Sequence, residues 1–114
     1  MRTSVQLIAE LNAVADVPGA EFCIAVLVVA FETENKFVFA RDKVALEELN
    51  EMISLGGKPV ALAQIYQIGQ TITFNIRPLD EYQNERWIDA WMKAAAQSAK
   101  SAMLESLRQR KQTS

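Results

Sequence analysis

The sequence predicts a single small α+β domain in which helices cover a four-stranded antiparallel sheet, with the element order α-β-β-α-β-β-α. Three observations lead to this fold. A run of apolar residues lies near the N-terminus, two segments of alternating polar and apolar residues lie in the middle of the chain, and the segment 80–112 contains neither proline nor glycine. With 114 residues, the chain is long enough to bury a core without disulfides or metals.

The apolar run, residues 22–31, is predicted to be the central strand. It is rich in β-branched and aromatic side chains, and neither of its alternating faces carries a charge. This pattern is typical of a strand that is covered on both sides. Cys23, the only cysteine, lies in this run. We expect it to be a buried small hydrophobe, and a reactive thiol is the alternative.

The first helix is expected over residues 3–15, where apolar residues recur at three- and four-residue spacing after a threonine or serine that can cap the helix. A proline and a glycine then end it. The central strand, about 20–31, is followed by a short polar loop and a second strand over 36–40. These two strands are therefore expected to form an antiparallel hairpin.

A second helix is expected from Asp42, as its N-cap, to about Leu55, and two glycines are expected to close it. The segment 56–58, Gly-Gly-Lys, also has the composition of a phosphate-binding loop, but such a loop precedes a helix rather than following one. Strands over 60–66 and 70–76 follow, and the alternation in the latter predicts one wet face and one buried face. We expect the helices to pack on one face of the sheet.

The segment 80–112 is predicted to be one long helix, because it consists of strong helix formers, begins with acidic residues and ends with basic ones. We therefore divide the chain into a sheet domain, 1–79, and a C-terminal helix, 80–114, packed partly on that domain. An apolar stripe follows the helix, with large residues in its first half and mostly alanines in its second. The stripe is expected either to complete the core or to contact another chain.

The amino-acid composition bears on which catalytic, metal-binding and nucleic-acid-binding functions we expect. The chain has no histidine and a net charge of −2, so it lacks the commonest general base and the commonest metal ligand. Paired carboxylates such as Glu47 and Glu48 are typical of a solvated helix face. We therefore expect no enzymatic activity, no cofactor and no bound metal. The acidic balance disfavours nucleic acid as a partner, and weak contact through the basic segment 108–111 is the alternative.

The sequence predicts a cytoplasmic protein that does not enter a membrane. Its longest apolar run, 22–31, is about half of the ~20 residues needed to cross a bilayer. Charged and polar residues interrupt the apolar positions near the N-terminus, so no signal-peptide core is present.

We expect a non-enzymatic protein-interaction or oligomerisation module, an accessory subunit of bacterial or phage origin that binds a second copy or another protein through its C-terminal helix. The expected contact residues follow the apolar stripe: Trp91, Ala95, Ala99, Ala102, Met103 and Leu107. The alternative is a small-molecule-binding domain with an apolar pocket. The best candidates for such a pocket are Tyr66, Tyr82 and Trp87.

Overall fold

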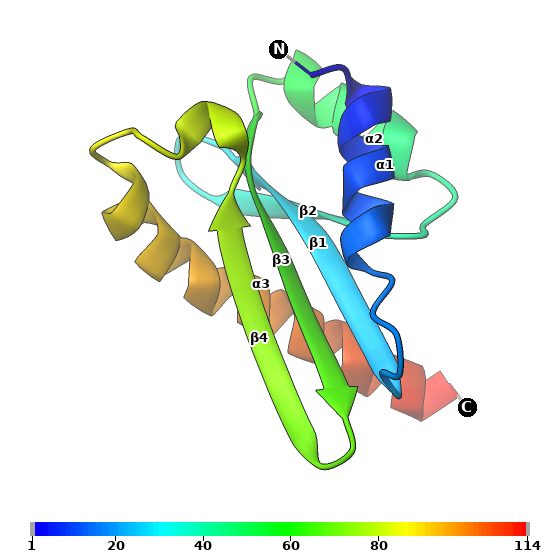
Figure 1. The fold of residues 1–114 in the computed structure, drawn as a ribbon. Helices are drawn as coiled ribbons and strands as arrows, with labels where there is room; N and C mark the ends of the chain where they lie inside the picture. The colour runs from blue at the N-terminus through cyan, green and yellow to red at the C-terminus, as the bar shows by residue number, and fades with distance from the viewer. Residues whose placement is uncertain (1, 114) are drawn as a thin grey trace.

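The computed structural model describes residues 2–113, and the side chains of residues 2–110. The element order is the predicted one (Figure 1). The elements are α1 (Ser4–Val14), β1 (Phe22–Ala30), β2 (Asn35–Phe39), α2 (Ala45–Ser54), β3 (Lys58–Ile68), β4 (Thr71–Pro78), the short 3-10 helix η1 (Asp80–Tyr82) and α3 (Ile88–Thr113).

The four strands form one antiparallel sheet with the spatial order β2-β1-β3-β4. β1 lies inside this sheet, and residues 24–29 of β1 are all buried. The prediction of a central strand covered on both faces is therefore confirmed. β2 and β4 form the two edges of the sheet.

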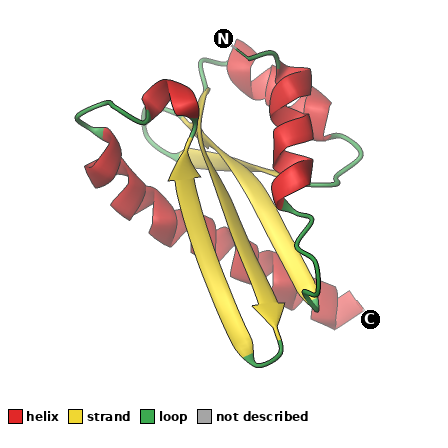
Figure 2. Ribbon diagram, in the orientation of Figure 1, coloured by secondary structure: helices red, strands yellow, loops and turns green. Residues whose placement is uncertain are grey.

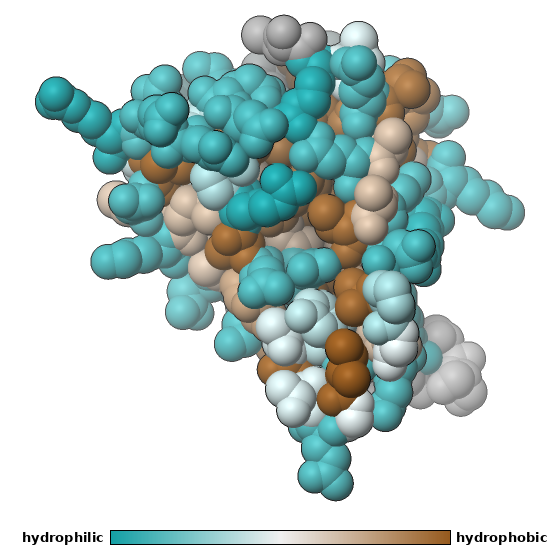
Figure 3. Space-filling view, viewed as in Figure 1, coloured by the Kyte–Doolittle hydropathy of each residue, from teal (hydrophilic) through white to brown (hydrophobic). Residues whose placement is uncertain are grey.

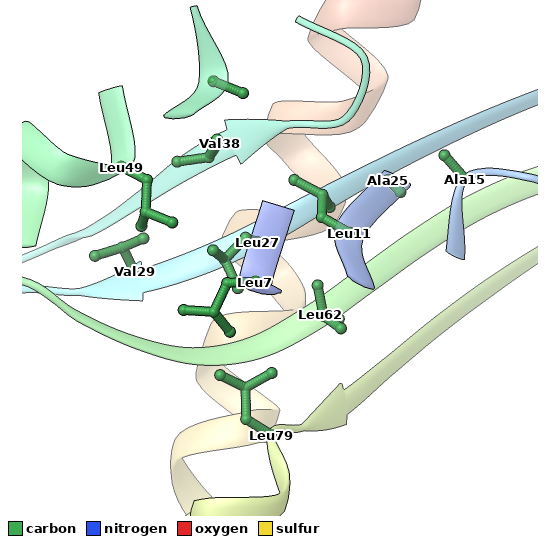
Figure 4. Close-up of a cluster of buried hydrophobic side chains, with 11 residues drawn as sticks. Leu7, Leu11, Ala15, Ala25, Leu27, Val29, Val38, Leu49, Leu62 and Leu79 are labelled. Carbon is green, nitrogen blue, oxygen red and sulfur yellow. The ribbon is translucent and has the colours of Figure 1, made fainter. Parts of the chain in front are cut away.

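Helices cover both faces of the sheet, whereas the sequence analysis placed them on one (Figure 2). On the first face, which we call the α1/α2 face, Leu7 and Leu11 of α1 and Leu49 of α2 pack toward Leu27 and Val29 of β1 (Figure 4). The opposite face, the α3 face, is covered by α3. Since successive β1 side chains point to opposite sides and are all apolar, each face needs its own cover.

The last helix begins at Ile88 rather than at Asp80 as predicted. Leu79 is buried on the α1/α2 face, whereas α3 packs on the other face. The chain therefore crosses the end of the sheet between these two points, through η1 and an irregular segment (Figure 1). A straight helix starting at Asp80 cannot follow this path.

The two N-terminal helices differ in how they begin. α1 has a capping box, in which the Gln6 backbone N–H donates to Thr3 Oγ1 at 3.2 Å and the Thr3 N–H donates to Gln6 Oε1 at 2.8 Å. The predicted cap of α2, Asp42, instead accepts a hydrogen bond from the Val44 N–H at 3.2 Å. α2 consequently starts later than predicted, at Ala45.

The glycine pair after α2 has two separate roles. Gly56 has a φ of +95°, the left-handed conformation that closes a helix, as predicted. At Gly57, a Cβ atom would lie 2.7 Å from the Phe31 ring and 2.7 Å from the Val29 side chain. The turn into β3 therefore packs directly against the end of β1. Both glycines thus have structural roles, as the prediction of a helix-closing segment requires and that of a phosphate-binding loop does not.

Candidate functional site

The centre of the predicted contact stripe on α3 is part of the core. Ala95, Ala99 and Met103 are each 0% exposed and pack against the strands of the α3 face. This is the first of the two roles that the sequence left open for the stripe. A second chain cannot reach these three side chains while α3 lies on the sheet.

The remaining stripe residues lie at the margins of the same contact. Trp91 and Leu107 are half-buried against the cluster of the α3 face, and Ala102 is half-buried in a hollow beside Phe39. Leu104, on the outer side of α3, is 46% exposed. A contact role for Trp91, Ala102 and Leu107 stays a prediction, and it involves the edges of α3 rather than its inner face.

The predicted pocket of three aromatic residues is not assembled. Tyr66 lies opposite Thr73, near the β3–β4 turn. Tyr82 follows the other end of β4, where Pro78 pairs with Ala61 near the start of β3. Ala61 and Tyr66 are about 16 Å apart along β3, at ~3.3 Å per residue. Tyr66 therefore cannot share a small pocket with Tyr82.

Tyr82, Trp87 and Trp91 do come together, where the chain crosses to the α3 face. The ring centroids of Tyr82 and Trp87 are 5.6 Å apart, and those of Trp87 and Trp91 are 6.3 Å apart, both edge to face. Such contacts stabilise the irregular segment that leads into α3. Trp87 nevertheless remains 43% exposed.

An apolar groove lies on the other side of Tyr82, between α1, the end of α2, the start of β3 and η1. Its volume is about 390 Å³, within the range of ~300–1,000 Å³ that is usual for small-ligand sites. Its apolar walls come from Leu7, Ile53, Pro59, Leu79 and Tyr82, and its charged groups are those of Arg2, Lys58 and Glu81.

Arg2 ties the N-terminal segment to the rim of this groove. Its guanidinium donates hydrogen bonds to the carboxylates of Glu10 and Glu81, and Arg77 donates to Glu10 at 3.3 Å. The hydrogen bond from Arg2 holds the pKa of Glu81 below its usual range. Arg2 thus stabilises the ionised form of Glu81, the opposite of what a general acid needs, so Glu81 supports the structure here.

The β3–β4 hairpin determines which backbone groups of β4 are free. Ile68 pairs with Thr71 across a two-residue turn in which Gly69 has a φ of +59°. Hydrogen bonding alternates along such a ladder, so Thr71 and every second residue after it bond to β3. The bond from the Leu79 N–H to the Val60 carbonyl, 2.7 Å long, continues the same alternation beyond the strand.

The intervening residues, Ile72, Phe74 and Ile76, therefore direct their N–H and C=O groups away from β3. β4 pairs with β3 alone, and no loop or side chain in the described part of the chain bonds to these three residues. The sequence analysis did not identify this surface, because strand order decides which strand lies at an edge.

One exposed apolar side chain, that of Ile72, adjoins the free edge. Ile72 is 60% exposed on the α3 face, and Ile68, at the end of β3, is 46% exposed on the other face. In the lower part of Figure 3, where Figure 1 places the hairpin, a few hydrophobic atoms lie among pale and hydrophilic ones on the α1/α2 face. Natural edge strands are usually protected by charges, proline or bulges. No charged residue lies between Thr71 and Ile76, whereas the other edge strand, β2, is shorter and carries Lys36.

The remaining candidates from the sequence are Cys23 and the basic end of α3. Cys23 is half-buried with its Sγ 3.8 Å from the Val14 carbonyl oxygen, and burial raises the pKa of its thiol, which disfavours the reactive thiolate. Arg108 pairs with Glu105 on the same helix. The side chain of Lys111 lies outside the described residues.

Two further findings concern the residues that the structure describes. Among them, no cluster of histidine, cysteine, aspartate and glutamate has the arrangement of a metal site. None of their helices has the length and apolar character required to cross a membrane.

No protein-family model, no curated protein and no solved structure matches this chain.

Proposed function

We propose that this protein is a non-enzymatic protein-interaction module that associates through the outer edge of β4. The observation that carries the proposal is that the free backbone groups of Ile72, Phe74 and Ile76 lie beside the exposed side chain of Ile72. A partner strand added to such an edge forms main-chain hydrogen bonds and buries apolar side chains together.

The proposal moves the contact surface from α3 to the edge of the sheet, and gives α3 a supporting role. Phe74 and Ile76 pack in the cluster that α3 covers, and the Lys100 ammonium lies 5.8 Å from the centre of the Phe74 ring. These contacts hold β4 in place from behind. The edge is therefore ordered before a partner binds, which lowers the entropy lost on association.

The proposal is tested by capture from an extract of the source cells with three forms of the immobilised chain. Ile72→Lys places a charge on the proposed surface, and Val5→Lys, at a residue of α1 that is 63% exposed, is the matched control. We expect a protein partner, which includes further copies of this chain, to be retained by the wild type and Val5→Lys and lost from Ile72→Lys. Equal retention by both variants would contradict the proposal.

The groove beside Tyr82 supports a second candidate function, binding of a small apolar molecule. Because Tyr82 lines the groove and its ring contacts that of Trp87, a bound ligand is expected to change the tryptophan emission. We expect a saturable change with a series of apolar ligands that is lost in Ile53→Glu and kept in Ile72→Lys. The absence of any change across the series would count against this function.

A further inference from the structure

We infer that the partner at the β4 edge is a second copy of this chain, joined so that the two β4 strands run antiparallel about a two-fold axis at Phe74. This inference rests on the proposed function, because it names the partner of the same surface. The two sheets would then form one continuous sheet across the dimer.

All three residues with free groups pair with one another when the axis lies at Phe74. With the axis at Phe74, Phe74 lies opposite Phe74 of the second copy, and Ile72 lies opposite Ile76 of the second copy. Each opposed pair exchanges both of its N–H···O bonds, as hydrogen-bonded antiparallel pairs do. A shift by one residue would oppose groups that already bond to β3. A shift by two residues in one direction would bring Pro78, which has no N–H, into the ladder.

The same register explains why Ile72 is uncovered in a single copy. Ile72 and Ile76 point to the α3 face, where Ile76 packs against the cluster under α3 but Ile72 is 60% exposed. Pairing places Ile72 of one copy directly beside the covered Ile76 of the other. In the view of Figure 1, α3 begins beyond the outer edge of β4, on the side where the second copy would lie. Each copy thus supplies the cover that the other lacks.

The distribution of charged residues along β4 also favours self-association. In this register Thr73 lies opposite Asn75 of the second copy on the α1/α2 face, and Arg77 lies opposite Thr71 of the second copy. No two like charges of the β4 strands are therefore opposed, whereas opposed like charges destabilise strand pairs. β2 is less suitable as the interface, since it is shorter and its Lys36 would enter the contact.

Disulfide trapping tests the register. Thr73 and Asn75 of the second copy form a non-hydrogen-bonded pair, whose Cα atoms lie about 4.5 Å apart, within the range that a disulfide spans. In a Cys23→Ser background, we expect Thr73→Cys chains mixed with Asn75→Cys chains to form a cross-linked dimer under mild oxidation. Either variant alone is expected to stay uncross-linked, because its thiols are then diagonal neighbours about 7–8 Å apart. Cross-linking of one variant alone, at least as fast as that of the mixture, would overturn the register.

Native mass by light scattering tests the dimer itself. We expect the wild type to approach twice its chain mass of 12.7 kDa as concentration rises. Ile72→Pro removes an outward N–H on each copy, and should weaken the dimer at least about tenfold, from ~1 kcal/mol per hydrogen bond lost. Asn35→Pro is the matched control: its N–H points outward from β2, because the bond from the Ala40 N–H to the Ala25 carbonyl sets the alternation there. This variant should remain dimeric.

The outcomes separate this inference from the proposed function. A wild type that stays a monomer at about 1 mM, where even a weak specific dimer forms, overturns the dimer. If such a monomer still captures another protein through Ile72, the interaction module stands with a different partner. If a monomeric wild type captures no protein through Ile72, both the dimer and the proposed interaction module are wrong. A dimer that Asn35→Pro abolishes and Ile72→Pro leaves intact would assign the interface to β2 and overturn the inference.

Discussion

The methyl group of Ala99 fills the space between α3 and the sheet, and its side chain is 0% exposed. A small residue at this place lets the helix backbone approach the strands closely. The same property suits a helix that packs on another chain, so the sequence left both roles open. The distinction depends on the sheet that α3 meets, which no local pattern in α3 reveals.

Ala99→Glu is therefore expected to destabilise the fold itself. A carboxylate at this position would be buried without a partner and would also overfill the contact. We expect a loss of more than about 4 kcal/mol in the free energy of unfolding, measured by urea denaturation. Leu104→Glu, on the exposed side of the same helix, should change that free energy by no more than about 0.5 kcal/mol. A cooperative Ala99→Glu variant of wild-type stability would show that α3 does not lie on the sheet.

At the scale of elements, α3 is the sole helical cover of the α3 face among the described elements. The part of α3 that follows Ser98 supplies Ala99, Met103 and Leu107 to that contact. A chain that ends at Ser98 leaves Val26 and Val28 beneath an open face, and exposing several buried aliphatic side chains costs about 1.5–3 kcal/mol each. This total rivals the whole stability of a small domain, about 5–15 kcal/mol.

We therefore expect the chain truncated after Ser98 to lose cooperative thermal unfolding, followed by circular dichroism. A chain truncated after Arg110, which keeps every described side chain of α3, should retain the transition. A truncation at Ser98 that unfolds as cooperatively as the full chain would show that the part of α3 after Ser98 contributes nothing to the core.

The type and order of the elements were predictable because both follow from local spacing. Alternation of polar and apolar residues predicted strands, and apolar residues at three- and four-residue spacing predicted helices. The long segment without proline or glycine predicted α3. The crossing between Leu79 and Ile88 was not predictable, because it depends on which face buries each residue. The β4 edge was missed for the same reason: the alternation of β4 is visible in the sequence, but its place at the end of the strand order is not.

At the scale of the whole molecule, Arg2 connects the N-terminal segment to η1 through Glu81. The folded-state pKa of Glu81 lies below its ordinary value because of that hydrogen bond, so the contact stabilises the fold at neutral pH and is lost as pH falls through the folded pKa. The pKa of Glu48 is shifted in the opposite direction. Burial, followed by the charges of Asp42 and Glu51, raises its pKa, so its protonation favours the fold as pH falls.

These signs predict opposite effects for two neutralising variants. At pH 7, Glu81→Gln should lower the free energy of unfolding by up to about 1 kcal/mol, the range of a partly exposed ion pair, and Glu48→Gln should raise it slightly. At about pH 3, below the ordinary pKa of a glutamate, both differences should shrink. Denaturant titrations at the two pH values measure this, and a Glu81→Gln deficit that is unchanged in acid would show that the carboxylate charge is not its source.

The position of α3 after all four strands also bears on how the protein is made. During synthesis the sheet and the other two helices emerge first, while the helix that covers the α3 face is still being added. At about 5–20 residues per second, the 26 residues of α3 take roughly 1–5 s to translate. Throughout that interval the nascent chain presents an uncovered apolar sheet face and an open strand edge, both of which favour aggregation. Newly made chains are thus most dependent on molecular chaperones while α3 is being synthesised.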